Sequence, residues 1–475
     1  MIILNDSKNT IHLEDVDEYI SPTGDTETIS PDRLKKSRSL RNAILNGTIK
    51  VIEHDPKERI ESSLMYLLNK MASSKNETVV TSDPDPDPEI LEEVSDDIEV
   101  RIHGLFYDAS GYAKVNRNLA LNLHQSGIKV KIDPKNGQNH LNEDELRSLV
   151  ALERTPISKR NHIVIDSIIP SFSEFSSAKY KVLYTTIESY TVQDPFLSAC
   201  QNYDEIWTTS DWSTSILKRY LPDHKIYAIS TGVDPSIYTE DGDRFDFKPN
   251  IKKFVFLSVF AWNYRKGPDV LCKAYFDEFS QADDVSLLIM SRYQSGRTRH
   301  HREKIRIDID KYMETYPNKD MPHLVRFNQM LPEKDMPKLY RASDAFILTT
   351  RGESGCLPPL EASLCGLPVI MTNCSGQQGY LRKDNSYMID IDKIAPLEKG
   401  KAHLHYWDGH DFPQLTSTGV HDQVKQYMRN VYENYDEARQ RNRKMQQLIH
   451  QKFTWTHTAN AAIERLKEIN KKLKG

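Results

Sequence analysis

The chain has 475 residues, of which 38% are hydrophobic, and its 63 Lys and Arg residues nearly balance its 68 Asp and Glu residues, for a net charge of -5. This length allows about three domains, and a charge so close to neutral gives no general reason to expect nucleic acid or an anionic membrane as a partner. The five cysteines form no CxxC pair, which favours reduced thiols in the cytoplasm over a disulfide framework or a zinc site.

The N-terminal part, residues 1–82, predicts a mostly helical extension. A start signal, Ser-Pro-Asp, opens the segment 30–47, and hydrophobic residues recur at helical spacing in the segment 55–72. The N-terminus lacks the basic and apolar regions of a signal peptide, and no apolar run approaches the ~18 residues of a membrane helix. We expect a cytoplasmic protein. Contact with a membrane surface, and a homo-oligomer formed through these helices, are both compatible with this sequence.

An acidic, proline-containing linker is expected at residues 83–98. Residues 83–99 hold nine acidic residues and no Lys or Arg. Alternating prolines block a helix, and like charges repel one another. A metal-binding DxD motif is the alternative interpretation, but the prolines keep these carboxylates from converging on one ion.

From residue 99 the chain alternates short apolar strands with helices, which is typical of a parallel sheet covered by helices on both faces. The series 99–245 predicts an N-terminal Rossmann-like domain, and the series 246–435 predicts a C-terminal one. Residues 436–475 have the pattern of polar helices. The expected fold class is α/β, with two doubly wound domains facing a cleft at the carboxyl ends of their strands, where ligands bind in this architecture.

Residues 349–370, TTRGESGCLPPLEASLCGLPVI, follow an apolar strand and place two glutamates around a strand-to-helix turn. Pro358 suits the first turn of a helix running to Gly366, and the free N–H groups of that helix start can hold phosphate oxygens. Glu353 in the loop and Glu361 one turn into the helix can accept hydrogen bonds from sugar hydroxyls. The pattern indicates a nucleotide sugar. An ordinary helix-start acid and a surface acid are the alternative.

Four segments resemble the retaining glycosyltransferase family 4, the glycosyl transferases group 1. RGESGCLPPLEASLCGLPVI is similar to the E-x7-E signature of that family, and SVFAWNYRKGPDVLCKAY is similar to its phosphate-binding segment with R-K-G. STGVDPSIY and DEIWTTSDWSTSILK are similar to two segments of its N-terminal domain. The four segments lie between residues 204 and 370, and the resemblance as a whole covers roughly residues 100 to 470. The resemblance implies a GT-B fold, transfer with retention of configuration, no obligatory metal and no cofactor, and C-terminal helices that pack back on the N-terminal domain.

The resemblance also implies roles for individual residues. Glu361 would bind the donor ribose, Glu353 would contact the transferred sugar, and Arg265 and Lys266 would bind the diphosphate. Glu353, Lys266 and Arg265 are therefore the expected catalytic group. The donor-binding set contains Glu361 together with Ser354, Gly355, Cys356, Leu357, Pro358 and Gly267.

Three features depart from the family pattern. The segment VFAW stands where the family usually has an arginine ahead of R-K-G, so diphosphate binding would depend on Arg265 and Lys266. Ser354 and Cys356 replace glycines, and the Cys356 side chain would narrow the sugar pocket. The N-terminal domain is also short for this fold.

The acceptor side of the cleft has weaker candidates. Ser110, Gly111 and Tyr112 form a corner at the first helix of the N-terminal domain, and Glu188 follows a strand; a simple turn and a capping acid are equally compatible with them. The run 292–306 has six Arg or Lys residues and one Glu. It is either a solvated helix face or a site for an anionic acceptor.

We therefore expect a transferase that moves a sugar from a UDP- or GDP-linked donor to a glycan, lipid-linked or other hydroxyl acceptor. Two alternatives stay open: a non-catalytic GT-B-like binding or assembly protein, and a glycosyltransferase acting on modified nucleic acid. A dinucleotide-dependent oxidoreductase is disfavoured because GLFYDASGY, after the first strand of the 99–245 series, does not supply GxGxxG.

Overall fold

The computed structural model divides the chain into two units, residues 1–88 and 89–475. In the first unit the structure describes only the backbone of five short strands, which form a three-stranded antiparallel sheet of order β4-β1-β5 and a separate β2–β3 pair. Their bounds are Ile2–Asn5 (β1), Ile11–Leu13 (β2), Glu18–Ile20 (β3), Thr26–Thr28 (β4) and Ile49–Glu53 (β5). The helices expected at 30–47 and 55–72 lie outside the described residues.

In the second unit the structure describes residues 91, 92 and 94 and most of the chain from 98 onward. The described ranges are 98–135, 141, 143–158, 162–170, 178–247, 251–293, 299–316, 319–327, 331–397 and 409–474. Leu91 and Val94, from the end of the acidic segment, pack against the core of the N-terminal lobe.

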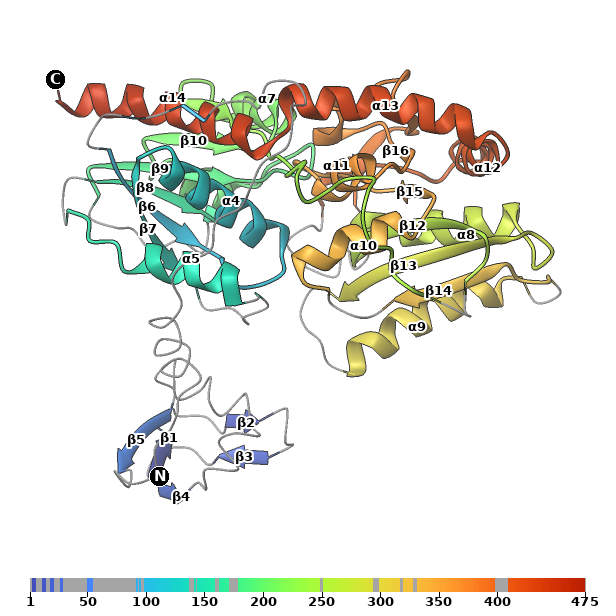
Figure 1. Ribbon diagram of the computed structural model, residues 1–475, viewed down its shortest axis with the longest axis horizontal. Helices are drawn as coiled ribbons and strands as arrows, with labels where there is room; N and C mark the ends of the chain where they lie inside the picture. The colour runs from blue at the N-terminus through green and yellow to red at the C-terminus, as the bar shows by residue number, and fades with distance from the viewer. Residues whose placement is uncertain are drawn as a thin grey trace. The chain divides into compact units, whose positions relative to one another are not determined.

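The N-terminal lobe is built on a six-stranded parallel sheet of order β11-β10-β9-β8-β6-β7 (Figure 1). Its central strands are short runs that are almost completely buried, as expected for strands covered on both faces. The elements are β6 (Glu99–Gly104), α4 (Gly111–Gln125), β7 (Lys129–Pro134), α5 (Glu143–Glu153), β8 (Ile163–Ser167), β9 (Tyr180–Thr185), α6 (Asp194–Cys200), β10 (Glu205–Thr208), α7 (Asp211–Tyr220) and β11 (Ile226–Ala228).

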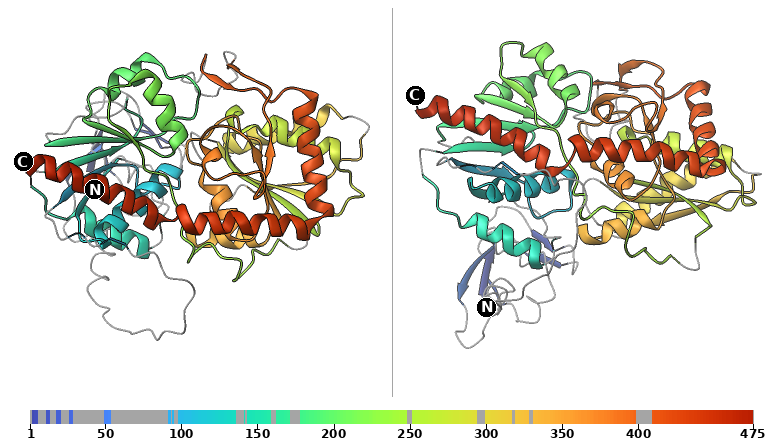
Figure 2. Two further views of the ribbon diagram at one scale, coloured as in Figure 1. Left: turned by 90° about the horizontal axis from the view of Figure 1, so that it is seen from above. Right: turned by 45° about the horizontal axis from the view of Figure 1, so that its top comes forward.

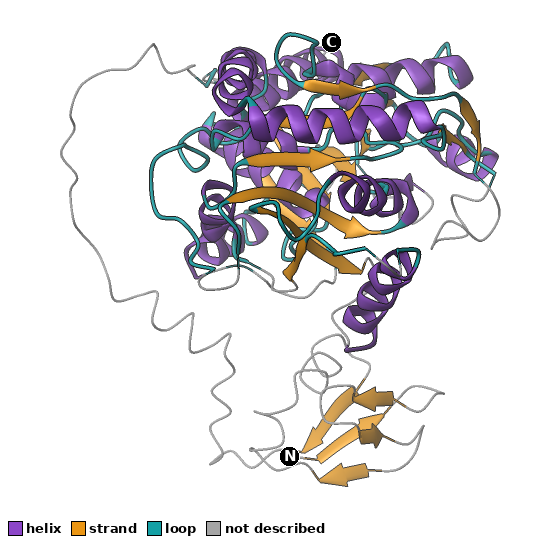
Figure 3. Ribbon diagram, turned by 90° about the vertical axis from the view of Figure 1, so that its right-hand side faces the viewer, coloured by secondary structure: helices purple, strands orange, loops and turns teal. Residues whose placement is uncertain are grey.

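The C-terminal lobe has a second six-stranded parallel sheet, of order β14-β13-β12-β15-β16-β17. Figure 3 shows strands of the second unit lying between helices. The elements of the C-terminal lobe up to the last strand are β12 (Phe254–Trp262), η2 (Tyr264–Lys266), α8 (Pro268–Glu278), β13 (Val285–Tyr293), α9 (Arg299–Glu314), β14 (His323–Phe327), η3 (Glu333–Asp335), α10 (Met336–Arg341), β15 (Ala345–Leu348), α11 (Leu357–Leu364), β16 (Val369–Thr372), η4 (Ser375–Gly379), β17 (Tyr387–Ile389), β18 (Ile394–Pro396) and β19 (Asp411–Pro413). The two sheets confirm the predicted α/β class with two Rossmann-like lobes.

The chain passes between the lobes twice, and the two crossings lie side by side. The Val233 N–H donates to the Phe453 carbonyl at 2.9 Å. A Cβ on Gly232 would lie only 2.3 Å from the Thr454 backbone, so glycine is needed for this approach. The first crossing comes before the boundary expected at 245 because Phe245 packs on the C-terminal lobe, with its ring centre 5.3 Å from that of Phe327.

The last three helices, α12 (Thr418–Glu433), α13 (Tyr435–Lys452) and α14 (Trp455–Lys474), divide between the lobes. Helix α12 packs on α8 and α13 on α11, whereas α14 packs on α4 of the N-terminal lobe (Figures 1 and 2). Residues of α14 such as Ile463 and Leu466 belong to the N-terminal core. Among the helices that the structure describes, none is long and apolar enough to cross a membrane.

Candidate active site

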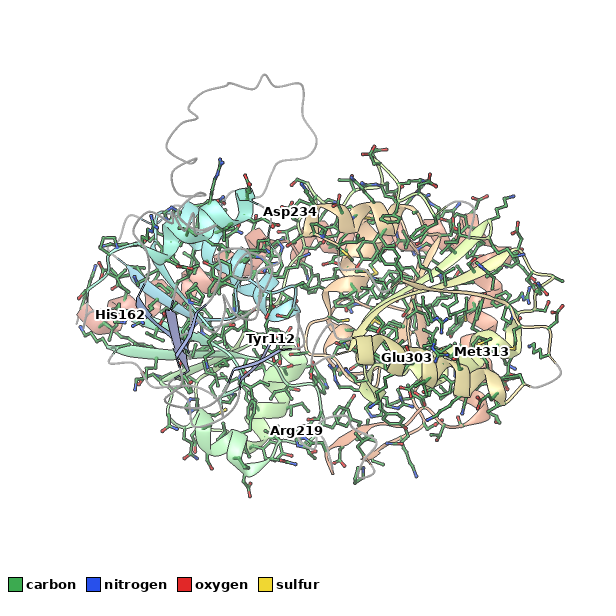
Figure 4. All side chains as sticks on the ribbon, turned by 90° about the horizontal axis from the view of Figure 1, so that it is seen from below. Tyr112, His162, Arg219, Asp234, Glu303 and Met313 are labelled. Atoms are coloured by element: carbon green, nitrogen blue, oxygen red, sulfur yellow. The ribbon has the colours of Figure 1, made fainter. Side chains whose placement is uncertain are left out.

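A cavity of about 470 Å³ lies between the two lobes, at the carboxyl ends of both sheets. The strand order changes direction between β6 and β8 in one sheet and between β12 and β15 in the other. Ligands of doubly wound sheets bind outside such switch points. Residues that follow β6, β9, β12 and β15 line the cavity, and Figure 4 shows one of them, Tyr112, at the junction of the lobes.

Two loops of the C-terminal lobe, after β12 and after β15, press against each other. The Arg351 N–H donates to the Arg265 carbonyl at 2.6 Å, and the Thr349 hydroxyl donates to the Gly267 carbonyl at 2.7 Å. Gly267 has φ +69°, and a Cβ there would lie 1.8 Å from the Thr349 carbonyl oxygen. The glycine of R-K-G thus allows the two loops to meet.

A buried arginine that no sequence motif marked, Arg351, joins the same loops. Its guanidinium lies 2.9 and 2.8 Å from the two carboxylate oxygens of Asp269, donates to the Tyr264 carbonyl at 2.7 Å, and stacks 3.8 Å from the centre of the Tyr264 ring. Bidentate pairing and stacking hold a guanidinium in one orientation. Arg351 therefore fixes the loop that carries Arg265 and Lys266.

The Glu353 carboxylate lies against both expected diphosphate ligands. Lys266 Nζ is 2.6 and 2.7 Å from its two oxygens, and Arg265 is 3.3 Å from Oε1. The Thr350 hydroxyl also donates to Oε1, at 2.8 Å. Burial by itself raises the pKa of Glu353, but Lys266 and Arg265 outweigh it, so the pKa lies below its ordinary value. This carboxylate is ionised at neutral pH.

Glu188 brings a second carboxylate to this cluster from the N-terminal lobe. Its Oε1 lies 2.9 Å from Arg265, so Arg265 joins acids of both lobes. Burial is the main cause that raises the pKa of Glu188, and the Glu353 charge adds to it against the opposing effect of Arg265. The loop that contains Gly352 packs closely against the backbone of Glu188. A Cβ at position 352 would lie only 2.1 Å from the Glu188 carbonyl oxygen.

Glu361 is held by groups of both lobes. Lys114 Nζ, from α4, lies 2.7 Å from Oε1, and the Tyr340 hydroxyl donates to Oε2 at 2.7 Å. Lys114 also pairs with Glu333 at 2.7 Å and donates to the Tyr238 hydroxyl at 2.7 Å. Burial lowers the pKa of Lys114, but Glu361, Tyr238 and Glu333 outweigh it and raise the pKa well above its usual value. No sequence motif marked Lys114.

The loop before α11 lines the cavity with five of the expected donor-binding residues: Ser354, Gly355, Cys356, Leu357 and Pro358. The Ser354 hydroxyl lies 2.5 Å from that of Thr209 and 2.8 Å from that of Ser213, so it bonds to the N-terminal lobe. Helix α11 begins without a side-chain cap, and because Pro358 and Pro359 carry no N–H, Leu357 is the one residue among its first three with an N–H to offer an anion. Gly267, by contrast, lies behind the cavity wall, against Thr349.

The acceptor-side candidates Ser110, Gly111, Tyr112 and Glu188 all line the cavity from the N-terminal lobe. The Ser110 side chain accepts from the Ala113 N–H and caps α4, a role that the sequence did not predict for it. The Tyr112 hydroxyl forms a hydrogen bond with the Thr186 hydroxyl.

The basic run 292–306 is only partly described, because residues 294–298 and the side chains of 292, 293 and 299–302 lie outside the described part. Within the described part, Arg306 pairs with Glu303 at 2.6 Å and Asp310 at 2.8 Å on an exposed face of α9. No group of three or more His, Cys, Asp or Glu side chains placed to hold a metal ion occurs among the described residues.

Comparison with known proteins finds one matching family model and a shared fold. Residues 251–399 match the family model of the glycosyl transferases group 1. No curated protein matches the sequence as a relative. Among solved structures, sucrose-phosphate synthase from Thermosynechococcus elongatus has a TM-score of 0.54 at 13% identity, over 78% of this chain and 99% of that one.

Two further structures are similar at the same level. The Anabaena HepE protein in complex with UDP-glucose has a TM-score of 0.52 at 12% identity, over 78% of this chain and 100% of that one. The E. coli trehalose-6-phosphate protein bound with UDP-2-fluoro glucose has a TM-score of 0.54 at 12% identity, over 78% of this chain and 99% of that one. The likeness at this identity shows the fold. The family model of the glycosyl transferases group 1 thus matches the C-terminal lobe, residues 251–399, and the GT-B fold extends over both lobes.

Proposed function

We propose that the chain moves a sugar from a nucleoside diphosphate sugar to a hydroxyl group of an acceptor, with retention of configuration. The observation that carries the proposal is the position of Glu353, with Lys266 at 2.6 Å and Arg265 at 3.3 Å beside a helix start. Cations bind the negative charge of a diphosphate, and hydrogen-bond acceptors beside them bind the hydroxyl groups of the sugar attached to that diphosphate. This cluster supplies both.

The donor would lie along the C-terminal lobe. Arg265, Lys266 and the Leu357 N–H at the start of α11 would bind the diphosphate, and Glu361 would bind the ribose. Lys266 becomes available to phosphate when Glu353 turns to the hydroxyls of the transferred sugar. The UDP-glucose and UDP-2-fluoro glucose bound by proteins of this fold favour a UDP-linked donor; a GDP-linked donor is the alternative.

In the proposed reaction the bond between the anomeric carbon and the diphosphate oxygen breaks. A bond from that carbon to the acceptor oxygen forms on the same face, and the acceptor proton passes to the departing diphosphate. The products are the glycosylated acceptor and a nucleoside diphosphate. Arg265 and Lys266 would stabilise the leaving charge while Glu353 orients the sugar, so the protein acts by positioning and electrostatics. The proposed step uses no metal and no cofactor.

The test is a panel of UDP- and GDP-linked sugars, with nucleoside diphosphate release and thermal stabilisation as readouts. With the active donor, Glu353→Gln and Lys266→Ala are expected to slow release by about a hundredfold or more, because each removes electrostatic support at the reacting centre. Glu437→Gln and Lys444→Ala, on the exposed face of α13, are the matched controls and keep the wild-type rate.

Two results would count against the proposal. Wild-type release rates in both site variants, with melting temperatures unchanged, would contradict the assignment of Glu353 and Lys266. Thermal stabilisation of the wild type by a nucleotide sugar without any diphosphate release, with or without acceptors, would favour the non-catalytic binding protein instead.

A further inference from the structure

If the chain transfers sugars as proposed, the same cavity also selects the acceptor by charge. We infer that its acceptor side takes an uncharged, hydroxyl-rich sugar rather than a phosphorylated or polyanionic acceptor, and that Thr185 is one of the groups that bind it. The inference rests on three observations: the charge of the cavity lining, the pairing of its cations, and an unpaired hydroxyl at its wall.

The described lining of the cavity is acidic. It contains four cations, Lys114, Arg117, Arg265 and Lys266, and six carboxylates: Asp108, Glu145, Glu188, Glu333, Glu353 and Glu361. Three of the six acids, Asp108, Glu145 and Glu188, belong to the N-terminal lobe, which faces the donor loops across the cavity. A wall of this sign repels an anion and raises the cost of placing a phosphate beside it.

All four cations already have carboxylate partners in the same lining. Lys114 and Arg117 pair with Glu333, at 2.7 and 3.3 Å, and Lys266 and Arg265 pair with Glu353 at 2.6 and 3.3 Å. The donor diphosphate would engage Arg265 and Lys266. The two cations of the described lining that remain, Lys114 and Arg117, both pair with Glu333 of the opposite lobe, so an acceptor phosphate would have to compete with that carboxylate.

The N-terminal wall offers hydroxyl groups instead. Ser110, Tyr112, Ser167, Thr185 and Thr186 all line the cavity from this lobe. Thr185 is the last residue of β9, and its side-chain oxygen is buried, with no hydrogen-bond partner among the described residues; the residue is 1% exposed. Buried hydroxyls are normally paired. An unpaired one at the wall of a cavity, beside Glu188, suits the hydroxyl groups of a bound sugar.

The experiment compares matched acceptors that differ by one phosphate, using the donor found in the panel above. Diphosphate release is measured without acceptor, with glucose or mannose, with glucose 6-phosphate or mannose 6-phosphate, and with duplex DNA. We expect the uncharged sugars to accelerate release about tenfold more than their phosphorylated partners. If no donor releases diphosphate under any condition, the proposed function itself is refuted. This result differs from one in which a donor reacts but the uncharged sugars have no advantage, which refutes only the inference about the acceptor.

Variants test the residues. Thr185→Val keeps the shape and removes the hydroxyl, so it is expected to raise the KM for the uncharged acceptor about tenfold. Thr155→Val, in the same lobe but outside the cavity lining, is the matched control and leaves that KM unchanged. Glu145→Lys reverses one charge of the cavity lining. It is expected to reduce the difference in the rate of diphosphate release between the uncharged and the phosphorylated sugar.

Several outcomes would overturn the inference. Equal or faster release with a phosphorylated sugar or with DNA would do so, and would direct attention to the basic run 292–306. No acceleration by any uncharged sugar would also overturn it, and an unchanged acceptor KM in Thr185→Val would remove that residue from the site.

Discussion

At the scale of single residues, the donor loop holds a side chain in a backbone conformation that favours glycine. Cys356 has φ +63°, and among the described non-glycine residues only Ser375 shares a positive φ. Burial raises the pKa of the Cys356 thiol well above its usual value, and the Glu353 charge adds to this effect. The thiol is therefore neutral at physiological pH and adds volume, not charge, to the expected sugar pocket.

Replacing Cys356 by glycine and by alanine separates backbone strain from loss of the side chain. Both changes remove the thiol, but only glycine relieves the positive φ, so Cys356→Gly is expected to be more stable than Cys356→Ala by about 1 kcal/mol. Urea unfolding of the two variants measures the difference. An alanine variant as stable as the glycine variant would show that this backbone is not strained.

At the scale of elements, a buried ion pair holds helix α14 on the N-terminal lobe. Arg465 donates to the two carboxylate oxygens of Glu205 at 3.0 and 2.8 Å and lies 3.7 Å from the centre of the Tyr227 ring. Glu205 is fully buried in β10 and also accepts from Trp207 at 2.7 Å. This contact, together with the apolar face of α14, attaches the end of the chain to the first lobe.

Arg465→Met is expected to lower the free energy of unfolding by about 3–5 kcal/mol, because it leaves the Glu205 charge buried without its partner. The double variant Arg465→Met, Glu205→Gln is expected to recover much of that loss, since the uncompensated charge is gone. Urea denaturation measures both. Arg443→Met, at an exposed position of α13, is the control. A loss in Arg465→Met no larger than in this control would contradict the role of the pair.

At the scale of the whole second unit, ion pairs cross the cleft and join the lobes. Lys114 of α4 contacts Glu333 and Glu361 of the C-terminal lobe, both at 2.7 Å, and Arg265 contacts Glu188 at 2.9 Å. Because one lysine serves two carboxylates, and one of these is the expected ribose ligand, donor binding and lobe closure share the same groups.

Lys114→Met is expected to weaken lobe closure, since a side chain of similar length then lacks the charge that joins α4 to Glu333 and Glu361. The radius of gyration of the ligand-free protein, measured by small-angle X-ray scattering, should increase relative to wild type. Lys114→Arg should restore it, because the cation returns. The same radius in Lys114→Met and wild type would show that these pairs do not hold the cleft.

Acidic pH is expected to weaken the contacts between the lobes, as Lys114→Met does. Burial raises the pKa of Glu333, but Lys114 and Arg117 outweigh it, so its pKa in the folded protein lies below the ordinary 4.5. A lowered pKa means that ionised Glu333 stabilises the folded protein at neutral pH, and that this contribution is lost as the pH falls through the lowered value. The stability difference between wild type and Glu333→Gln should therefore shrink below pH 4.5.

The sequence by itself determined the fold class, and it marked residues that the structure places in the lining of the cavity between the lobes. Strand-helix alternation, the R-K-G turn and the two glutamates around Pro358 all depend on local rules: side-chain periodicity, the φ that glycine permits and the proline at a helix start. These rules act over a few residues, so they can be recognised in the sequence without the fold.

Only the tertiary structure decided which partners these residues have. Lys114 and Glu361 are separated by 247 positions in the chain, yet their charged atoms lie 2.7 Å apart. Arg351 lies two residues from Glu353 but turns to Asp269 on the other loop. For the contact between Lys114 and Glu361, the sequence offered only a lysine on a predicted helix, and such lysines are common at protein surfaces. Ion pairs and unpaired hydroxyls such as that of Thr185 depend on distances set when the sheets and lobes pack, and no local pattern encodes those distances.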